Sequence, residues 1–263
     1  MARHGSRTRE HAPLPAALPP ESRPVGQLVA ETLRLYGRRF WPALMLGLPI
    51  ALLDLALPQL SQAGRILFTF TAGGVLLTLS YIGGAALAAG RRPSLPSFAV
   101  ALAAGFLIFL PFPVLVAFLV LPALAWLALL GLAVPAALLE ELGFAAALRR
   151  GYQLGRADYI HALGSLSALG IVYFLTRLVL YVVLHGANET GERTAAFLAD
   201  VVLTPILFLG AGLLYFDQVA RLESGGPRSR RSRDADLHHA VEPNRSGRAD
   251  AQGEPRPAAR GEP

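Results

Sequence analysis

The sequence contains no cysteine and no lysine, and charged residues of either sign are few. The absence of cysteine excludes a disulfide framework, a thiolate metal site and a thiol nucleophile. Only 16% of the 263 residues are charged while 53% are hydrophobic, a balance too apolar for an ordinary soluble domain. All 24 basic side chains are arginines, and together with the abundant alanine, leucine, glycine and proline this indicates a GC-rich bacterial genome.

The apolar residues come in long uncharged blocks and not at amphipathic spacing. A helix needs roughly 20 apolar residues to cross a bilayer, so the blocks supply about six spans. We expect them at residues 40–57, 66–90, 98–118, 120–139, 160–185 and 196–219. The uncharged region 98–139 must hold two spans, and Pro111, Pro113 and Pro122 are its candidate breakpoints. The fold class expected is an all-α, polytopic membrane helix bundle.

The two ends of the chain are too poor in apolar residues to form a packed core. We therefore expect residues 1–24 and 222–263 to be disordered tails flanking a membrane domain at 25–221. The run PRSRRSR in the second tail is able to bind anionic lipid headgroups, although the acids that follow it favour a merely solvated tail. The first hydrophobic block begins only near residue 40, which argues against a cleavable signal peptide.

Arginine is distributed unevenly over the expected loops, and this orients the chain. With six spans and both termini in the cytoplasm, all arginines fall inside except Arg65 and Arg193, which lie outside, and Arg177, which lies within a span. We therefore expect a multi-pass protein of the bacterial inner (plasma) membrane. The net charge of +6 follows from this topology, so the expected partner is the lipid bilayer and not nucleic acid.

Two amphipathic segments lie outside the expected spans. In VGQLVAETLRLYGRRFW, residues 25–41, apolar side chains recur at helical spacing opposite Gln27, Glu31, Arg34 and Arg38. This pattern predicts an interfacial helix that leads into the first span, with Trp41 at headgroup depth. A simple extension of the first span is the alternative.

The second amphipathic segment, LLEELGFAAALRRGYQLGRADY, covers residues 138–159. Its apolar stripe, at helical spacing, is able to lie on the headgroups or to pack under the bundle; it consists of Phe144, Leu148 and Tyr152. We expect Glu140 and Glu141 in the first turn of its helix and Arg149 and Arg150 in the last, as the helix dipole favours. Gly151 and Gly155 are the expected stops.

The same segment resembles an element of bacterial membrane proteins of the glycerophosphoryl diester phosphodiesterase membrane domain family. The matching positions are Glu140 or Glu141, Gly143, Ala147, Leu148, Arg150 and Leu154, with Gly151 where the family usually has serine. A second match follows Pro205, where LLYFDQVAR supplies Tyr215, Asp217 and Arg221, the last two at i, i+4 spacing.

The resemblance covers residues 25–221 and implies a six-helix membrane domain with both tails in the cytoplasm. The family is named after proteins that carry a separate phosphodiesterase domain. We expect no such domain in this chain, so the resemblance does not imply that activity.

The sequence offers no recognisable catalytic or metal-binding motif. A His-Glu-x-x-His pair is absent, and Ser165 and Ser167 lack the Gly-x-Ser-x-Gly surroundings of a serine nucleophile. Small residues at four-residue spacing, such as Ser80 and Gly84 or Gly164 and Ala168, instead predict close helix packing. We expect no catalytic residue, no metal, no cofactor and no enzymatic activity.

Three ionisable residues, Asp54, Arg177 and Asp200, fall inside the expected spans, where charges are costly. Counted from the cytoplasmic edges at 1.5 Å per residue, they lie roughly 21, 26 and 26 Å up their helices. Neighbours on the same helical faces are Tyr173, Tyr181, His185 and Thr204. Matched depths predict a buried, bidentate pair of Arg177 with Asp200, with Asp54 as second acceptor if the first span closes the bundle. Snorkelling of Arg177 and a polar cavity open to the outside are the alternatives.

The sequence thus predicts a non-enzymatic membrane scaffold or membrane-organising component. A transporter or permease for a small solute is the alternative, supported by the intramembrane charges and by the kink expected at Thr204–Pro205. A membrane enzyme acting on lipid is the third possibility. A water-sized cavity from Arg177 to the midplane would favour transport, whereas a filled bundle would favour the scaffold.

Overall fold

The computed structural model describes residues 20–184 and 189–224, and all regular structure in these residues is helical. Six segments are long and apolar enough to cross a membrane: Phe40–Gln59, Gln62–Ala89, Leu95–Phe118, Val120–Leu139, Tyr159–Val183 and Gly191–Ser224. The predicted all-α helix bundle with six candidate spans is confirmed. Apart from residues 20–24 and 222–224, the predicted tails lie outside the described residues.

The first four spans are each divided into two or three helical segments. The first contains α2 (Phe40–Leu44), α3 (Leu48–Ala56) and the 3-10 turn η2 (Leu57–Gln59), and the second contains α4 (Gln62–Phe68), the π-helical turn η3 (Thr69–Gly73) and α5 (Gly74–Ala89). The third contains α6 (Leu95–Phe109) and α7 (Phe112–Phe118), and the fourth α8 (Val120–Trp126), the π-helical turn η4 (Leu127–Gly131) and α9 (Ala133–Leu139).

The uncharged region 98–139 divides at Leu119, whose backbone is extended with φ −169° and ψ 148°. The prolines expected to break this region instead lie where helices begin. Pro111 is the N-cap of α7, and Pro113 and Pro122 lie in the first turns of α7 and α8. Proline is tolerated there because the first backbone N–H groups of a helix have no intrahelical acceptor.

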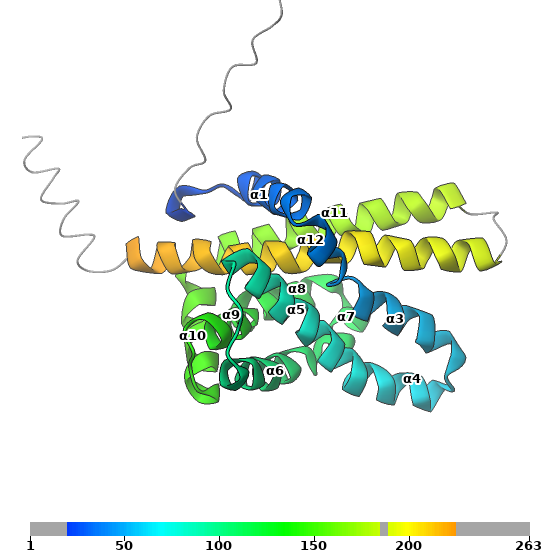
Figure 1. Ribbon diagram of the computed structural model, residues 1–263, viewed down its shortest axis with the longest axis horizontal. Helices are drawn as coiled ribbons and strands as arrows, with labels where there is room; N and C mark the ends of the chain where they lie inside the picture. The colour runs from blue at the N-terminus through cyan, green and yellow to red at the C-terminus, as the bar shows by residue number, and fades with distance from the viewer. Residues whose placement is uncertain (1–19, 185–188, 225–263) are drawn as a thin grey trace, which may run out of the picture.

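Two long helices, α11 (Tyr159–Leu184) and α12 (Glu189–Ser224), lie side by side along the long axis of the molecule (Figure 1). In the apolar stretch of α12, 61% of the residues are buried, against 6% in α11. Helix α12 packs on α1, α3, α5, α10 and α11, so it is the central helix of the bundle.

Helix α12 runs through Pro205 without interruption, so no helix break occurs at Thr204–Pro205. Proline removes the N–H that would bind the carbonyl four residues earlier, which belongs to Val201. That carbonyl lies against Gly47 at the start of α3, where a methyl group would clash with it. The glycine therefore allows α3 to approach the backbone of α12 at the proline.

Helix α1 (Val25–Arg38) is separate from the first span and is not an extension of it, because the backbone turns at Arg39 with φ −122° and ψ 41°. Leu28 and Thr32 are buried where α1 lies against α11 and α12 (Figure 1). The preceding turn η1 (Pro20–Ser22) also packs on α12. Residues 20–24 thus belong to the folded body and not to the predicted tail.

Helix α10 (Phe144–Ala157) lies crosswise to α12 at one end of the bundle, here called the α10 end (Figure 1). The helix begins one residue after Gly143, so the prediction of Glu140 and Glu141 in its first turn is wrong. Glu140 is the C-cap of α9, and Glu141 has a positive φ of 53°. The opposite end of the bundle, where the turn η2 lies between α3 and α4, is called the α3–α4 end.

Gly151 and Gly155 do not stop α10, which continues to Ala157. Both are buried, and a Cβ on Gly151 would meet the backbone of Ala133, while one on Gly155 would meet the carbonyls of Ala128 and Leu129. The small-residue face of α10 therefore packs under α9 and η4. Phe144 and Tyr152, at the two ends of the predicted apolar stripe, are exposed.

Candidate functional site

Asp54, Arg177 and Asp200 meet near the α3–α4 end of the bundle, and we call them the Arg177 triad. Arg177 Nη2 donates to Asp54 Oδ2 at 2.8 Å, and Arg177 Nη1 donates to Asp200 Oδ1 at 2.8 Å. Each carboxylate thus receives one nitrogen, so the arginine bridges two acids and forms no bidentate pair. The bridge ties α3, α11 and α12 together.

The Asp200 side of the triad is buried, whereas the other two side chains are partly open. Asp200 is 0% exposed, while the side chains of Asp54 and Arg177 are 36% and 37% exposed. The Tyr173 hydroxyl donates to Asp200 Oδ1 at 2.9 Å and accepts from Arg177 Nη1 at 2.8 Å. Asp200 Oδ2 and the hydroxyl of Thr204 are buried without a hydrogen-bond partner among the described residues.

A cavity of about 240 Å³ opens beside the exposed part of the triad. Its lining contains both polar and apolar side chains: Ala51, Asp54, Leu55, Pro58, Gln59, Arg177, Arg193, Ala196 and Phe197. A second hollow of about 120 Å³ lies next to Arg177, Tyr181 and Glu192. Both linings consist of residues near the α3–α4 end, while Leu169 and Leu203, further toward the middle of the bundle, are buried. The ion-pair bridge and the open cavity therefore occur together at the Arg177 triad. His185, expected on the same helical face as Arg177, lies outside the described residues.

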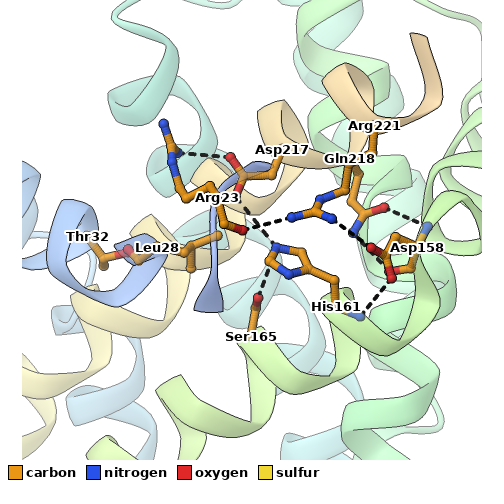
Figure 2. A network of polar contacts seen from close by, with 9 residues as sticks. All are labelled: Arg23, Leu28, Thr32, Asp158, His161, Ser165, Asp217, Gln218 and Arg221. Atoms are coloured by element: carbon orange, nitrogen blue, oxygen red, sulfur yellow. Dashed lines mark hydrogen bonds and ion pairs between the residues drawn. The ribbon is translucent and has the colours of Figure 1, made fainter. Parts of the chain in front are cut away.

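A second polar network lies at the α10 end (Figure 2). Arg23 Nη1 donates to Asp217 Oδ1 at 2.9 Å, and Arg221 Nη1 donates to Asp158 Oδ2 at 2.7 Å. Arg221 Nη2 also donates to the carbonyl of Arg23 at 2.8 Å. Asp217 and Arg221 stand at a spacing suited to an i, i+4 pair, but each of them pairs with a different element.

Gln218 completes the fastening of α12 to the corner between α10 and α11. Its Oε1 accepts from the backbone N–H of Asp158 at 3.2 Å, and its Nε2 donates to the Asp158 carbonyl at 3.1 Å. Asp158 Oδ1 accepts from the backbone N–H of His161 at 3.1 Å, in the manner of a helix N-cap. The side chains of Gln218 and Asp158 thus bind backbone groups of this corner and hold α12 against the junction of α10 and α11.

Ser165, His161 and Asp217 lie near one another in this network, in an order that resembles a hydrolase triad (Figure 2). The hydroxyl of Ser165 is 3.5 Å from His161 Nε2, and Asp217 Oδ2 is 3.7 Å from the same Nε2. In a catalytic triad the serine and the acid contact opposite nitrogens of the histidine ring. One nitrogen accepts the serine proton, and the acid holds the N–H of the other nitrogen. The arrangement therefore lacks the geometry of a nucleophile relay.

Several positions of the family resemblance meet in a third group beside the network. Arg150 Nε donates to both carboxylate oxygens of Glu140, at 2.9 and 3.0 Å, and the Tyr215 hydroxyl donates to Glu140 Oε1 at 2.7 Å. Glu141 and Gly143 are exposed and take no part in these bonds, and Pro205 lies further along α12. The structure brings together Glu140, Arg150 and Tyr215.

Sequence reasoning missed the partners Arg23, Asp158, His161 and Gln218. Asp158 carried a usable signal, since an aspartate just before a long apolar helix is a typical N-cap. Arg23 carried none, because it lies 194 residues from Asp217 in the sequence. No group of three or more histidine, aspartate or glutamate side chains in residues 20–184 and 189–224 is arranged to hold a metal ion.

No family model matches the chain, and neither a curated protein nor a solved structure matches it.

Proposed function

We propose that the protein is a non-enzymatic scaffold or membrane-organising component. The observation that carries this proposal is how the charged side chains of the bundle are used. Arg177 and Asp54 are 123 residues apart and Arg23 and Asp217 are 194 residues apart, yet each pair is joined at 2.8 or 2.9 Å. These two ion pairs therefore brace distant parts of the chain against one another.

The proposed orientation puts the α10 end and both termini in the cytoplasm of a bacterial inner membrane. The exposed arginines support it, because the α10 end carries Arg38, Arg39, Arg91, Arg92 and Arg149. Apart from Arg177 of the triad, which lies within a span, the segments beside the α3–α4 end carry only Arg65 and Arg193 among the described residues. Arginine is enriched in the cytoplasmic loops of membrane proteins.

The experiment replaces the whole Arg177 triad by leucine and asks whether the protein still works in cells that lack the natural gene. Leucine at Asp54, Arg177 and Asp200 removes all three charges of the triad, so none of them is left buried without a partner. If the protein is a scaffold, the triple variant should accumulate in the membrane and rescue the deletion phenotype. A triple variant that accumulates normally but does not rescue that phenotype would contradict the scaffold function.

A second candidate function, binding or transport of a small solute, is favoured by one observation. The 240 Å³ cavity presents a carboxylate of Asp54 and a guanidinium of Arg177 side by side. Such a pair suits a zwitterion, whose two charges match the two groups. The test screens a panel of amino acids and small amines by thermal unfolding. A compound that raises the thermal midpoint of the wild-type protein, but not that of the triple leucine variant, would support this function.

A further inference from the structure

We propose that Arg38, Arg39, Arg91 and Arg92 bind the headgroup of an anionic phospholipid at the α10 end. We call these four residues the basic seam, because they lie where the α1–α2 junction meets the loop between α5 and α6. The proposal does not depend on the scaffold function. It concerns residues of the folded body and not the arginines of the two tails.

Packing holds the two halves of the basic seam together. Leu87 near the end of α5 packs with Leu35 and Tyr36 of α1 against the buried cluster that contains Ala43 of α2. Arg39 Nη2 lies 3.5 Å from the point where a Cβ on Gly90 would sit. Arg91 and Arg92 follow that glycine directly, so the guanidinium group of Arg39 lies beside the start of the loop that carries them.

The four guanidinium groups of the basic seam are exposed and make no ion pair within the described part of the chain. Most other arginines there do donate to a partner: Arg23, Arg34, Arg65, Arg150, Arg156, Arg177 and Arg221. One acid, Glu141, lines a small niche with Arg91 and Arg92. Four cations against one carboxylate leave a surplus of positive charge, and guanidinium groups bind phosphodiesters in a bidentate manner.

The surface next to the basic seam is apolar, and this selects a lipid over a soluble anion. Trp41 is 74% exposed, and Phe40 on the same short helix and Met45 directly after it are also exposed. Tryptophan is enriched at the depth of the headgroups, where its ring contacts acyl chains and its N–H remains in the polar layer. The ligand that matches both surfaces carries a phosphate and acyl chains.

Tryptophan fluorescence provides the test, because the chain contains only two tryptophans. In the Trp126→Phe variant the emission reports on Trp41 alone. The protein is reconstituted into bilayers that contain brominated phosphatidylglycerol or brominated phosphatidylcholine, and quenching is compared. We expect phosphatidylglycerol to quench more strongly. Each substitution of Arg39, Arg91 or Arg92 by glutamine should lower its relative association constant about fivefold, and high salt should act in the same direction.

Matched variants separate a specific site from a general surface charge. Arg149→Gln removes an exposed, unpaired arginine of α10 and should leave the preference unchanged. Glu141→Gln removes the one competing acid and should strengthen it. Equal quenching by the two lipids, or a preference retained when all four arginines are glutamine, would overturn the proposal.

Native mass spectrometry of the wild-type protein gives a second measurement that does not rely on replacing Trp126. Detergent-solubilised protein incubated with equal amounts of the two lipids should retain phosphatidylglycerol. The fourfold glutamine variant should retain neither lipid preferentially. Retention of phosphatidylglycerol by that variant would place the lipid elsewhere and overturn the proposal.

Discussion

Asp200 carries its charge in a fully buried position, so the fold must neutralise it. Its carboxylate is 0% exposed, and Arg177 and Tyr173 both donate to the same oxygen atom. A buried carboxylate is costly unless a partner neutralises it, and removing that partner is worse than removing the pair. The bond to Arg177 therefore matters most for Asp200, since Asp54 keeps partial access to water.

We expect Arg177→Leu to lower the thermal midpoint of the detergent-solubilised protein. Breaking a buried pair costs roughly 3–5 kcal/mol, and a value at or below the lower end is expected because Arg177 is partly exposed. The double variant Arg177→Leu, Asp200→Leu should recover part of that loss, because no buried charge then remains without a partner. Additive effects of the two substitutions would show that Arg177 and Asp200 are not energetically coupled.

Tyr215 permits a similar measurement at the α10 end. Tyr215→Phe removes the hydroxyl that donates to Glu140 at 2.7 Å and should lower the free energy of unfolding by about 1–2 kcal/mol. Tyr152→Phe is the matched control, because its hydroxyl lies on an exposed face, 3.4 Å from Arg156 Nη1, and its loss should change little. If chemical denaturation shows equal losses of unfolding free energy for the two substitutions, the stabilising role of the bond between Tyr215 and Glu140 is refuted.

At the scale of elements, the approach of α10 to η4 depends on Gly155. Because a side chain there would meet the carbonyls of Ala128 and Leu129, Gly155→Ala should destabilise the protein by about 1–3 kcal/mol through overpacking. Gly37→Ala in α1 meets nothing within 4 Å, so it should be neutral or stabilising through helix propensity. Thermal midpoints in detergent, measured side by side, distinguish the two glycines.

Glycine also shows why part of the element structure could not be predicted. Glycine near the end of an amphipathic pattern is typical of a helix stop, and it is equally typical of close packing between helices. Only the position of η4 against α10 decides between these meanings for Gly151 and Gly155. The capping of α11 by Asp158, in contrast, rests on a local signal and was open to prediction.

At the scale of the whole molecule, the number of candidate spans was predictable because lipid leaves few alternatives. An uncharged block of about 20 residues can satisfy its backbone in lipid only as a helix or in a closed barrel. The meeting of Asp54, Arg177 and Asp200 was also predictable from their matched depths along the spans. The bond from Arg23 to Asp217 was not, since no periodicity connects residues at the two ends of the chain.

The absence of cysteine makes the proposed orientation directly measurable. A single cysteine in place of the exposed Gln62, at the α3–α4 end, should react with a membrane-impermeant maleimide in intact cells. A cysteine in place of the exposed Ala145, on α10, should react only after the membrane is permeabilised. Labelling of Ala145→Cys in intact cells would reverse or refute the orientation.

The central helix α12 also places a limit on the bilayer that suits this protein. Asp200 and Asp217 are separated by 17 positions, which is roughly 26 Å along an α-helix, slightly less than a typical hydrocarbon core of about 30 Å. A thicker membrane would draw both carboxylates and their arginine partners toward hydrocarbon, whereas a thinner one would hydrate them. Hydrophobic matching should therefore make the protein most stable in bilayers with a core near 26–30 Å, and it should unfold more readily among longer-chain lipids.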